Sequence, residues 1–454
     1  MHEIRLDYIR NYRINNPESH KKSVRLFKDQ LGIGEIVIVQ CLFKHSPEQL
    51  INSRLFYLEP ARTAFSPNAE PVTYPDKCKL TQLHLNARHG SRFPDPVDTK
   101  GFDMLEIAFA NVSVTKEYYK NVFPMKKNFQ LIKRGEIEPF FDGIQSRKRY
   151  AKFWDGVVYD PEVIKFQSSA TSRAGASAMS FSEGLFNGKG SVDKAKIQPV
   201  YISSVPDTQD PVLLPYVSCP RWIQTVLTNN ELLDEQLYAY GNNTLAPIAK
   251  RLTAEHAIDP PLDPALVPFI FTNCQFWVTH FNRADTWCSL LSPDELILVR
   301  YYYDILGYYI LQYGHPFAKN LACGYITQLV NGIDSYINGS STVMADLKNS
   351  HGYTILSTLT ALGLFKEEVP LTANFTLEQI KNVKFTEIIA IHWSSTLYFE
   401  VYTCEAGQTK IRVLLDFVPF VIPGCESEYC DWNKFKELLS DQIGCDFAAM
   451  CAYP

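Results

Sequence analysis

The chain has 454 residues, of which 46% are hydrophobic, 13% aromatic and 20% charged. This composition is typical of a globular protein and excludes disorder, collagen and coiled coil as the main state. The 44 Lys and Arg against 49 Asp and Glu give a net charge of −5, which provides no overall basic field for nucleic acid or an anionic membrane. No apolar run approaches the roughly 20 residues of a membrane helix, so we expect no membrane span. An anionic ligand would therefore need a local basic site.

The N-terminal segment, residues 1–70, combines a charged start with one strand-like run, Ile36 to Phe43. Met1 to Gln30 lack the apolar region of a secretory signal. We assign no chemistry to this segment, and its role stays open.

Two strand-to-helix junctions follow. A strand over Leu80 to Ala87 leads directly into Arg88 to Pro94, and a strand over Val163 to Ser168 feeds a helix of small residues, Arg173 to Phe186. Junctions of this kind are typical of an α/β sheet that presents polar groups at the carboxyl ends of its strands.

The middle of the chain is predicted to be helical. Its clearest helix begins at Ser292, Pro293 and Glu295, which form a capping box with proline in the first turn, and ends near Gly314. A further helix follows His351, and long strands are predicted for 390–403 and 411–422. We therefore expect an α/β sandwich with a central mixed sheet flanked by helices, formed by residues 71–199 and 341–454. A mainly helical insertion, residues 200–340, would cap it and leave a pocket between the two parts.

The segment Arg88-His89-Gly90-Ser91-Arg92-Phe93-Pro94 fits the pattern R-H-G-x-R-x-P. Five fixed positions would match by chance on the order of once in ten thousand chains of this length. Two guanidinium groups supply planar, permanent positive charge for a phosphate, and a neutral imidazole between them can attack phosphorus. Gly90 allows close backbone approach where the strand turns. The pattern therefore predicts a phosphate site with a histidine nucleophile.

The chain resembles the histidine phosphatase superfamily in its acid phosphatase and phytase branch, most closely the multiple inositol polyphosphate phosphatases. The likeness covers about residues 78 to 450. Besides the first motif, the similar stretches in chain order are Leu131 to Glu136, Ser169 to Phe181, Trp287 to Leu290, Gly314 to Pro316 and Leu356 to Phe365.

The resemblance implies a phosphomonoesterase that hydrolyses inositol polyphosphates, such as inositol hexakisphosphate, through a phosphohistidine. His89 would be the nucleophile, and His351 would donate a hydrogen bond to the phosphate. The residues that would bind the phosphate are Arg88, Arg92 and Arg173, and Lys100 is a further candidate for substrate binding. Nothing in the sequence suggests a metal or an organic cofactor, and the expected partner is a small phosphorylated molecule, not nucleic acid.

The chain departs from the family pattern after the second histidine. In the family this histidine is followed by Asp or by Ala-Glu, and that carboxylic acid protonates the leaving oxygen. Here Gly352 and Tyr353 occupy the matching positions, so Tyr353 stands where the proton donor is expected. Two alternatives stay open: a catalytically impaired pseudophosphatase that binds phosphorylated ligands, and an acid phosphatase of broad specificity.

Eleven cysteines favour disulfides and the secretory pathway, either the endoplasmic reticulum lumen or the extracellular space, and the odd count leaves at least one thiol unpaired. Short loops suggest the pairs Cys425/Cys430 and Cys445/Cys451. The resemblance implies Cys274/Cys288, and Cys78 and Cys404 could join the beginning and end of the sheet domain. The glycosylation sequons, which agree with a secreted glycoprotein, begin at Asn111, Asn242, Asn338 and Asn374.

Overall fold

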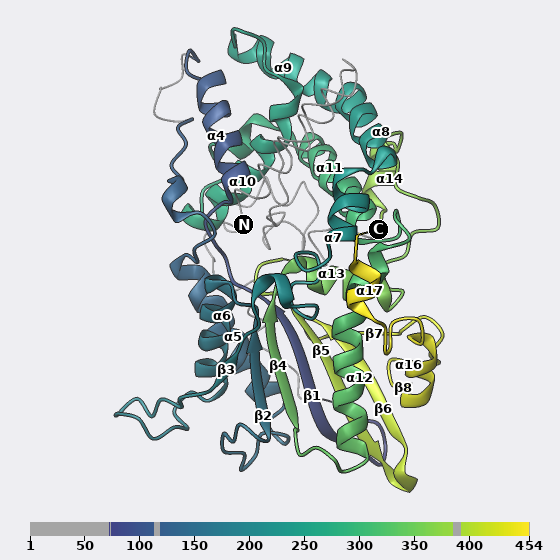
Figure 1. Cartoon of the computed structure of the whole chain (residues 1–454). Helices are drawn as coiled ribbons and strands as arrows, with labels where there is room; N and C mark the ends of the chain where they lie inside the picture. The colour runs from purple at the N-terminus through teal and green to yellow at the C-terminus, as the bar shows by residue number, and fades with distance from the viewer. Residues whose placement is uncertain (1–71, 73, 113–118, 385–391, 454) are drawn as a thin grey trace.

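A central mixed sheet forms the lower part of the molecule in Figure 1. The computed structural model describes residues 72, 74–112, 119–384 and 392–453, so the predicted strand at Ile36 to Phe43 lies outside the described residues. The strands are β1 (Cys78–Arg88), β2 (Ile164–Ser168), β3 (Ile202–Ser203), β4 (Ala345–Ser350), β5 (Thr396–Cys404), β6 (Thr409–Leu415), β7 (Val418–Phe420) and β8 (Cys430–Asp431). Their order is β3-β2-β4-β1-β5-β6-β7, with β8 beside β6. Strands β3, β2, β4 and β1 run parallel, whereas β5 to β8 pair antiparallel. The predicted mixed α/β fold is confirmed.

Helices cover both faces of the sheet. They are α4 (Pro96–Ala108), α5 (Lys133–Arg149), α6 (Ser172–Leu185), α7 (Pro220–Trp222), α8 (Glu231–Tyr240), α9 (Ala246–His256), α10 (Val267–Phe281), α11 (Pro293–Leu311), α12 (Cys323–Ile337), α13 (Gly352–Ala361), α14 (Leu377–Lys381), α16 (Trp432–Leu438) and α17 (Phe447–Cys451). Helices α5 and α6 pack on one face, where Phe181 and Leu185 join Leu83 and Leu85 of β1 in one core. Helix α12 crosses the other face, as Figure 1 shows, and contributes to a second core that continues into the helical part. Each core forms because strand residues alternate between the two faces.

The helical part lies above the sheet in Figure 1 and contains α8 to α11. Helix α4, which precedes residue 200, also belongs to this layer, because Gly101 packs directly against the ring of Phe269 in α10. The division of the chain into domains at residues 200 and 340 stays a prediction. No helix in the described ranges is long and apolar enough to cross a membrane.

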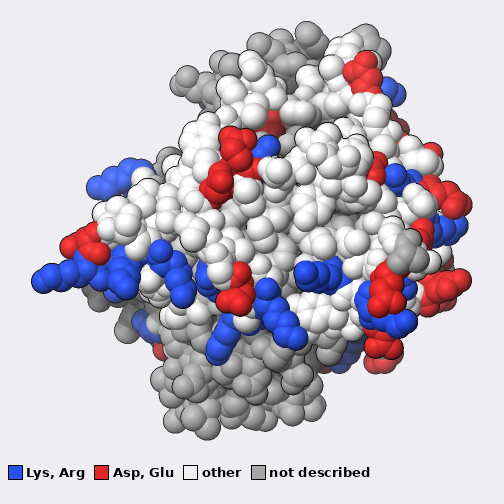
Figure 2. Space-filling view, turned by 90° about the horizontal axis from the view of Figure 1, so that it is seen from below, with Lys and Arg blue, Asp and Glu red and all other residues white. Residues whose placement is uncertain are grey.

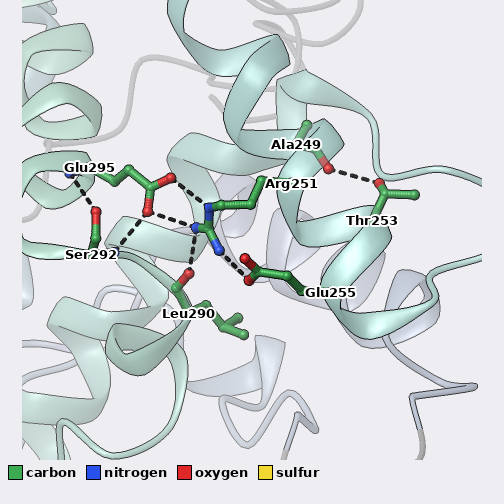
Figure 3. Close-up of polar contacts among 7 residues, drawn as sticks. All are labelled: Ala249, Arg251, Thr253, Glu255, Leu290, Ser292 and Glu295. Atoms are coloured by element: carbon green, nitrogen blue, oxygen red, sulfur yellow. Dashed lines mark hydrogen bonds and ion pairs between the residues drawn. The ribbon is translucent and has the colours of Figure 1, made fainter.

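An arginine joins two helices of this layer (Figure 3). Arg251 of α9 donates through Nε and Nη2 to the two carboxylate oxygens of Glu295, at 2.8 and 2.7 Å, and through Nη2 to Leu290 O at 2.9 Å. Glu295 also completes the predicted capping box with Ser292 at the start of α11. One carboxylate therefore stabilises both a helix end and the contact between α9 and α11.

The predicted strand over 411–422 is wrong in its length. The strand ends at Leu415, turns at Asp416 and Phe417, and returns as β7. Both turn residues have positive φ, 50° and 64°, as a two-residue hairpin turn requires. A mainly apolar run without Gly therefore concealed a hairpin. The described part of the strand predicted over 390–403 corresponds to β5, which begins only at Thr396.

Disulfides join distant parts of the chain. The expected pairs Cys78–Cys404, Cys274–Cys288 and Cys425–Cys430 are present in the structure. The pair Cys445/Cys451 is wrong, because Cys445 bonds to Cys323 and Cys451 to Cys219. The C-terminal segment lies against α7 and α12, and this packing brings each of its cysteines to a distant partner.

The surface carries charges of both signs. On the face seen from below the sheet, Lys and Arg side chains alternate with Asp and Glu side chains, and neither sign covers the face alone (Figure 2). This mixture agrees with the small net charge of the chain.

Candidate active site

The candidate site lies where the parallel strands β1 and β4 end. Arg88, the last residue of β1, pairs with Ser350, the last residue of β4. His89 N donates to Ser350 O at 3.2 Å, and His351 follows directly on the neighbouring strand. The two imidazole rings lie 5.3 Å apart between centroids. The first motif and the second histidine, more than 260 residues apart, therefore meet at one edge of the sheet.

Two contacts orient the His89 ring. Its Nδ1 lies 2.9 Å from Gly90 O, which can only accept, so Nδ1 carries the proton. Its Nε2 accepts from Nε of Arg173 at 3.2 Å. The lone pair of Nε2 is thus directed toward a guanidinium group, where a phosphate would bind. This tautomer is the one that a nucleophilic imidazole requires.

Arg173 also reaches the second histidine. Its Nη2 lies 3.3 Å from Nδ1 of His351, and Nε2 of His351 lies 2.8 Å from Oγ of Ser169. Because a guanidinium can only donate, Nδ1 accepts and Nε2 donates to the serine. Arg173 lies in the first turn of α6 and Ser169 just after β2, so the second predicted junction supplies both contacts.

Aromatic rings support the arginines. Arg88 and Arg92 are fully buried, and their guanidinium carbons lie 4.1 and 5.5 Å from the ring centroid of Trp393. The ring of Phe129 lies 5.3 Å from Arg92 and 5.1 Å from Arg173. An aromatic face stabilises a cation without neutralising it, so these rings support the buried guanidinium groups.

Close packing fixes the loop that carries the motif. A Cβ on Gly135, in the first turn of α5, would lie 1.8 Å from Ser91 O, and a Cβ on Gly90 would lie 1.9 Å from Gly135 O. Glu138 accepts from the backbone N and the Oγ of Ser91 at 2.8 and 2.9 Å, and its own position is held by Arg134 at 2.9 Å. Only glycine at both positions allows this approach of loop and helix.

A buried carboxyl group lies beneath the site. Asp142 of α5 accepts a hydrogen bond from Oγ of Ser394, the residue after Trp393. Burial raises the pKa of Asp142 to about 8. The hydrogen bond from Ser394 lowers this pKa, whereas the nearby carboxylates of Asp416 and Glu138 raise it. Asp142 is therefore largely protonated at neutral pH.

The helical layer touches the motif through His280, at the end of α10. Its Nε2 lies 3.2 Å from Arg92 O, and its ring lies between Phe93 and Phe123 at 4.8 and 4.9 Å. Burial lowers the pKa of His280 to about 4, so the ring is neutral and donates to the carbonyl. The helical layer thus supports the backbone of the motif.

Of the seven predicted site residues, the structure brings five into one cluster: Arg88, His89, Arg92, Arg173 and His351. Lys100 lies exposed on α4, and its place in the site stays a prediction. Tyr353 is 2% exposed and packs against Tyr216, 5.0 Å between ring centroids. Among the described residues, no group of three His, Cys, Asp or Glu side chains could hold a metal ion.

Sequence reasoning missed Trp393, Asp142 and the contact from His280. None of these residues belongs to a recognisable pattern along the chain. Ser169, which contacts His351, was not predicted as a site residue either. The sequence did carry a signal for it, because Ser169 begins the stretch around Arg173 that resembles the family.

The model of the histidine phosphatase superfamily (branch 2) matches residues 79–416. The chain belongs to this superfamily. The matched range contains the complete cluster, from Arg88 to Trp393, and both parts of the sheet that hold it.

Relatives within the superfamily include two well-matched curated proteins. Multiple inositol polyphosphate phosphatase 1 of Dictyostelium discoideum is 26% identical over 433 residues, which cover 81% of this chain and 67% of the relative. Phytase A of Aspergillus awamori is 27% identical over 389 residues, which cover 77% of this chain and 79% of the relative. Among solved structures, multiple inositol polyphosphate phosphatase of Bifidobacterium longum in complex with phosphate superposes with a TM-score of 0.66. The superposed region covers 85% of this chain and 97% of the Bifidobacterium longum chain, at 14% sequence identity. This likeness supports the fold.

Proposed function

We propose that this protein is a phosphomonoesterase that hydrolyses inositol polyphosphates through a phosphohistidine at His89. The observation that carries the proposal is the orientation of the His89 ring, with Nδ1 bonded to Gly90 O and Nε2 facing Arg173. An imidazole with an unprotonated Nε2, in one cluster with three guanidinium groups, is what attack on a phosphate requires.

In the first step Nε2 of His89 attacks phosphorus, an N–P bond forms, and the bond from phosphorus to the ester oxygen breaks. The leaving oxygen takes a proton and departs as an alcohol. In the second step a water attacks the phosphohistidine, the N–P bond breaks, and inorganic phosphate leaves. Arg88, Arg92, Arg173 and His351 would hold the phosphoryl oxygens in both steps, and preorganised charge of this kind lowers the barrier.

The substrate class is supported by the relatives, since both a multiple inositol polyphosphate phosphatase and a phytase cover most of this chain. The substrate would enter between the sheet edge and the helical layer, where α4 and α10 meet the motif. Lys100, exposed on α4, would then be available to a phosphate that is not being transferred.

We also propose a route through the secretory pathway. In the described part of the chain, five disulfides join ten cysteines, and such bonds persist in oxidising compartments. The sequon asparagines at 111, 242, 338 and 374 are all exposed, as attachment of a glycan would require.

The test is phosphate release from inositol hexakisphosphate across pH 4 to 8. The His89→Ala variant is expected to lose release and to form no acid-labile phosphoenzyme, whereas His256→Ala, at the end of α9, is expected to retain both. Release that persists in the His89→Ala variant would contradict the phosphohistidine route. Binding of substrate by the unchanged protein without any release would instead indicate a pseudophosphatase. Faster turnover of a small aryl phosphate than of inositol hexakisphosphate would indicate an acid phosphatase of broad specificity.

A further inference from the structure

A short turn directly before β5, residues 392–395, supports the backbone of the motif, and we call it the tryptophan turn. Its Ser394 N donates to His89 O at 3.2 Å. Arg88 N donates to Ser395 O at 2.8 Å. Ser394 has a positive φ of 58°, a conformation that is uncommon outside glycine and persists only where the surroundings hold it. The contacts that hold this turn therefore bear directly on the proposed nucleophile.

The ring of Trp393 contacts the side chains of the same cluster. Its centroid lies 4.1 Å from the guanidinium carbon of Arg88 and 5.5 Å from that of Arg92. The centroid of the His89 ring lies 5.6 Å away. A change in the position of the tryptophan turn would therefore change the contacts of both arginines and of the imidazole together.

His392 connects the tryptophan turn to the hairpin between β6 and β7. Its Nε2 lies 2.5 Å from Oδ2 of Asp416, at the hairpin turn, and its Nδ1 lies 2.9 Å from Trp393 O. The other carboxylate oxygen of Asp416 accepts from Thr396 N, the first residue of β5, at 2.9 Å. The carboxylate is thus fixed against the start of β5, and His392 joins it to the turn.

Both ring nitrogens of His392 face hydrogen-bond acceptors. A carbonyl oxygen and a carboxylate oxygen can only accept, so each nitrogen must carry a proton to make its bond. The ring makes both bonds only as the charged imidazolium. Burial opposes this charge, but the Asp416 carboxylate and the hydrogen bonds to Asp416 and Trp393 outweigh it and raise the pKa of His392 above its usual value.

Two neighbouring elements bring further ionisable groups to this ion pair. Asp142 of α5 also raises the pKa of His392, and it accepts from Ser394 of the tryptophan turn. Tyr398 of β5, which interacts with the carboxyl groups of Asp142 and Asp416, stays neutral because burial raises its pKa. A neutral imidazole keeps one proton, so one of the two bonds of His392 is lost when its charge is lost.

We propose that His392 is a positioning residue of the site: as an imidazolium it ties the tryptophan turn to Asp416 and holds the motif in place for an anion. This inference rests on the proposed function, since it concerns the same site. Because the pKa of His392 is raised, the ring stays charged at pH 6 and loses its charge toward alkaline pH. Affinity for a phosphate-like anion is therefore expected to fall as the pH rises.

The test is calorimetric titration with inositol hexasulfate at pH 6, 7, 8 and 9, because sulfate esters keep the same charge throughout this range. For the unchanged protein we expect Kd to rise about fivefold from pH 6 to pH 9, the equivalent of one ordinary hydrogen bond. The His392→Gln variant keeps a donor for Asp416 but carries no charge. It should raise Kd about fivefold at pH 6 and leave Kd unchanged at pH 9. The comparison at equal pH removes the effect of other groups that titrate.

A second variant, Asp416→Asn, keeps a residue that tolerates positive φ and an oxygen that can accept from Thr396. Without the carboxylate the pKa of His392 falls, so the rise in Kd should move to lower pH. The controls are Asp142→Asn and His256→Gln. Both should keep the rise in Kd, and the first of them separates the charge of His392 from the ionisation of Asp142.

A ratio of Kd values between His392→Gln and the unchanged protein that is equal at pH 6 and pH 9 would overturn the proposal, because the ring would then act through its shape alone. Loss of the rise in Asp142→Asn, or no binding by the unchanged protein at pH 6, would also overturn it. If His392→Gln does not fold, the direction of the shift in Asp416→Asn decides. Retained phosphate release in the His89→Ala variant would refute the proposed function, and that result does not depend on binding of the sulfate ester.

Discussion

The Asp142→Asn variant tests the burial of charge beneath the site. Asp142 lies on α5, is 8% exposed and accepts a hydrogen bond from Oγ of Ser394. Ser394 is the residue after Trp393, whose ring contacts Arg88. Asparagine matches the shape of the protonated carboxyl group and keeps an oxygen that can accept from the serine. The variant therefore mimics the neutral form and has no carboxylate to bury.

The magnitude follows from the pKa. Below pH 3.8 the carboxyl group is protonated in both the folded and the unfolded chain, and it has no effect on the pH dependence of stability. Between its ordinary pKa of 3.8 and the folded value of about 8, the unfolded chain releases the proton while the folded protein keeps it, so stability falls as pH rises. The full difference between the two pKa values corresponds to roughly 6 kcal/mol in the free energy of unfolding, and about 4 kcal/mol of this is lost between pH 4 and pH 7.

The assay is the free energy of unfolding in urea, with the disulfides intact, at pH 4, 5.5 and 7. The variant should match the unchanged protein at pH 4 and become progressively more stable relative to it toward pH 7. The control is Asp155→Asn, at an exposed position on the loop after α5, which should give a difference independent of pH. A pH-independent difference for Asp142→Asn as well, or a loss of stability at pH 7, would refute the reasoning.

Three further predictions concern the frame of the site. Trp393→Ala removes a ring from beneath two buried guanidinium groups, and at about 2 kcal/mol for a desolvated cation–π contact, KM for inositol hexakisphosphate should rise on the order of 30-fold. An unchanged KM would show that the ring does not position them. Gly135→Ala places a Cβ 1.8 Å from Ser91 O, so calorimetry should show a loss of at least about 1–3 kcal/mol in stability together with reduced turnover. A variant with unchanged stability and turnover would contradict the close packing. Non-reducing peptide mapping should recover Cys445 linked to Cys323, and a peptide joining Cys445 to any other cysteine would contradict the structure.

Local patterns in the sequence determined a large part of the fold and of the site. The apolar run before Arg88, the capping box at Ser292 and the small-residue helix after Arg173 are each confirmed as a strand end, a helix start and a helix. These predictions succeeded because each depends on a few residues that are neighbours along the chain. The motif at Arg88 to Pro94 also predicted the candidate site, because its chemistry is contained in seven consecutive residues.

Tertiary structure alone decided which groups meet. Trp393 comes to lie beneath Arg88 through the antiparallel pairing of β5 with β1, and no pattern in the sequence specifies that partner. The partner of Cys445 and the burial of Asp142 likewise follow from the packing of segments far apart in the chain. Sequence patterns report local backbone preference, whereas distances and dielectric surroundings arise only when the chain is folded.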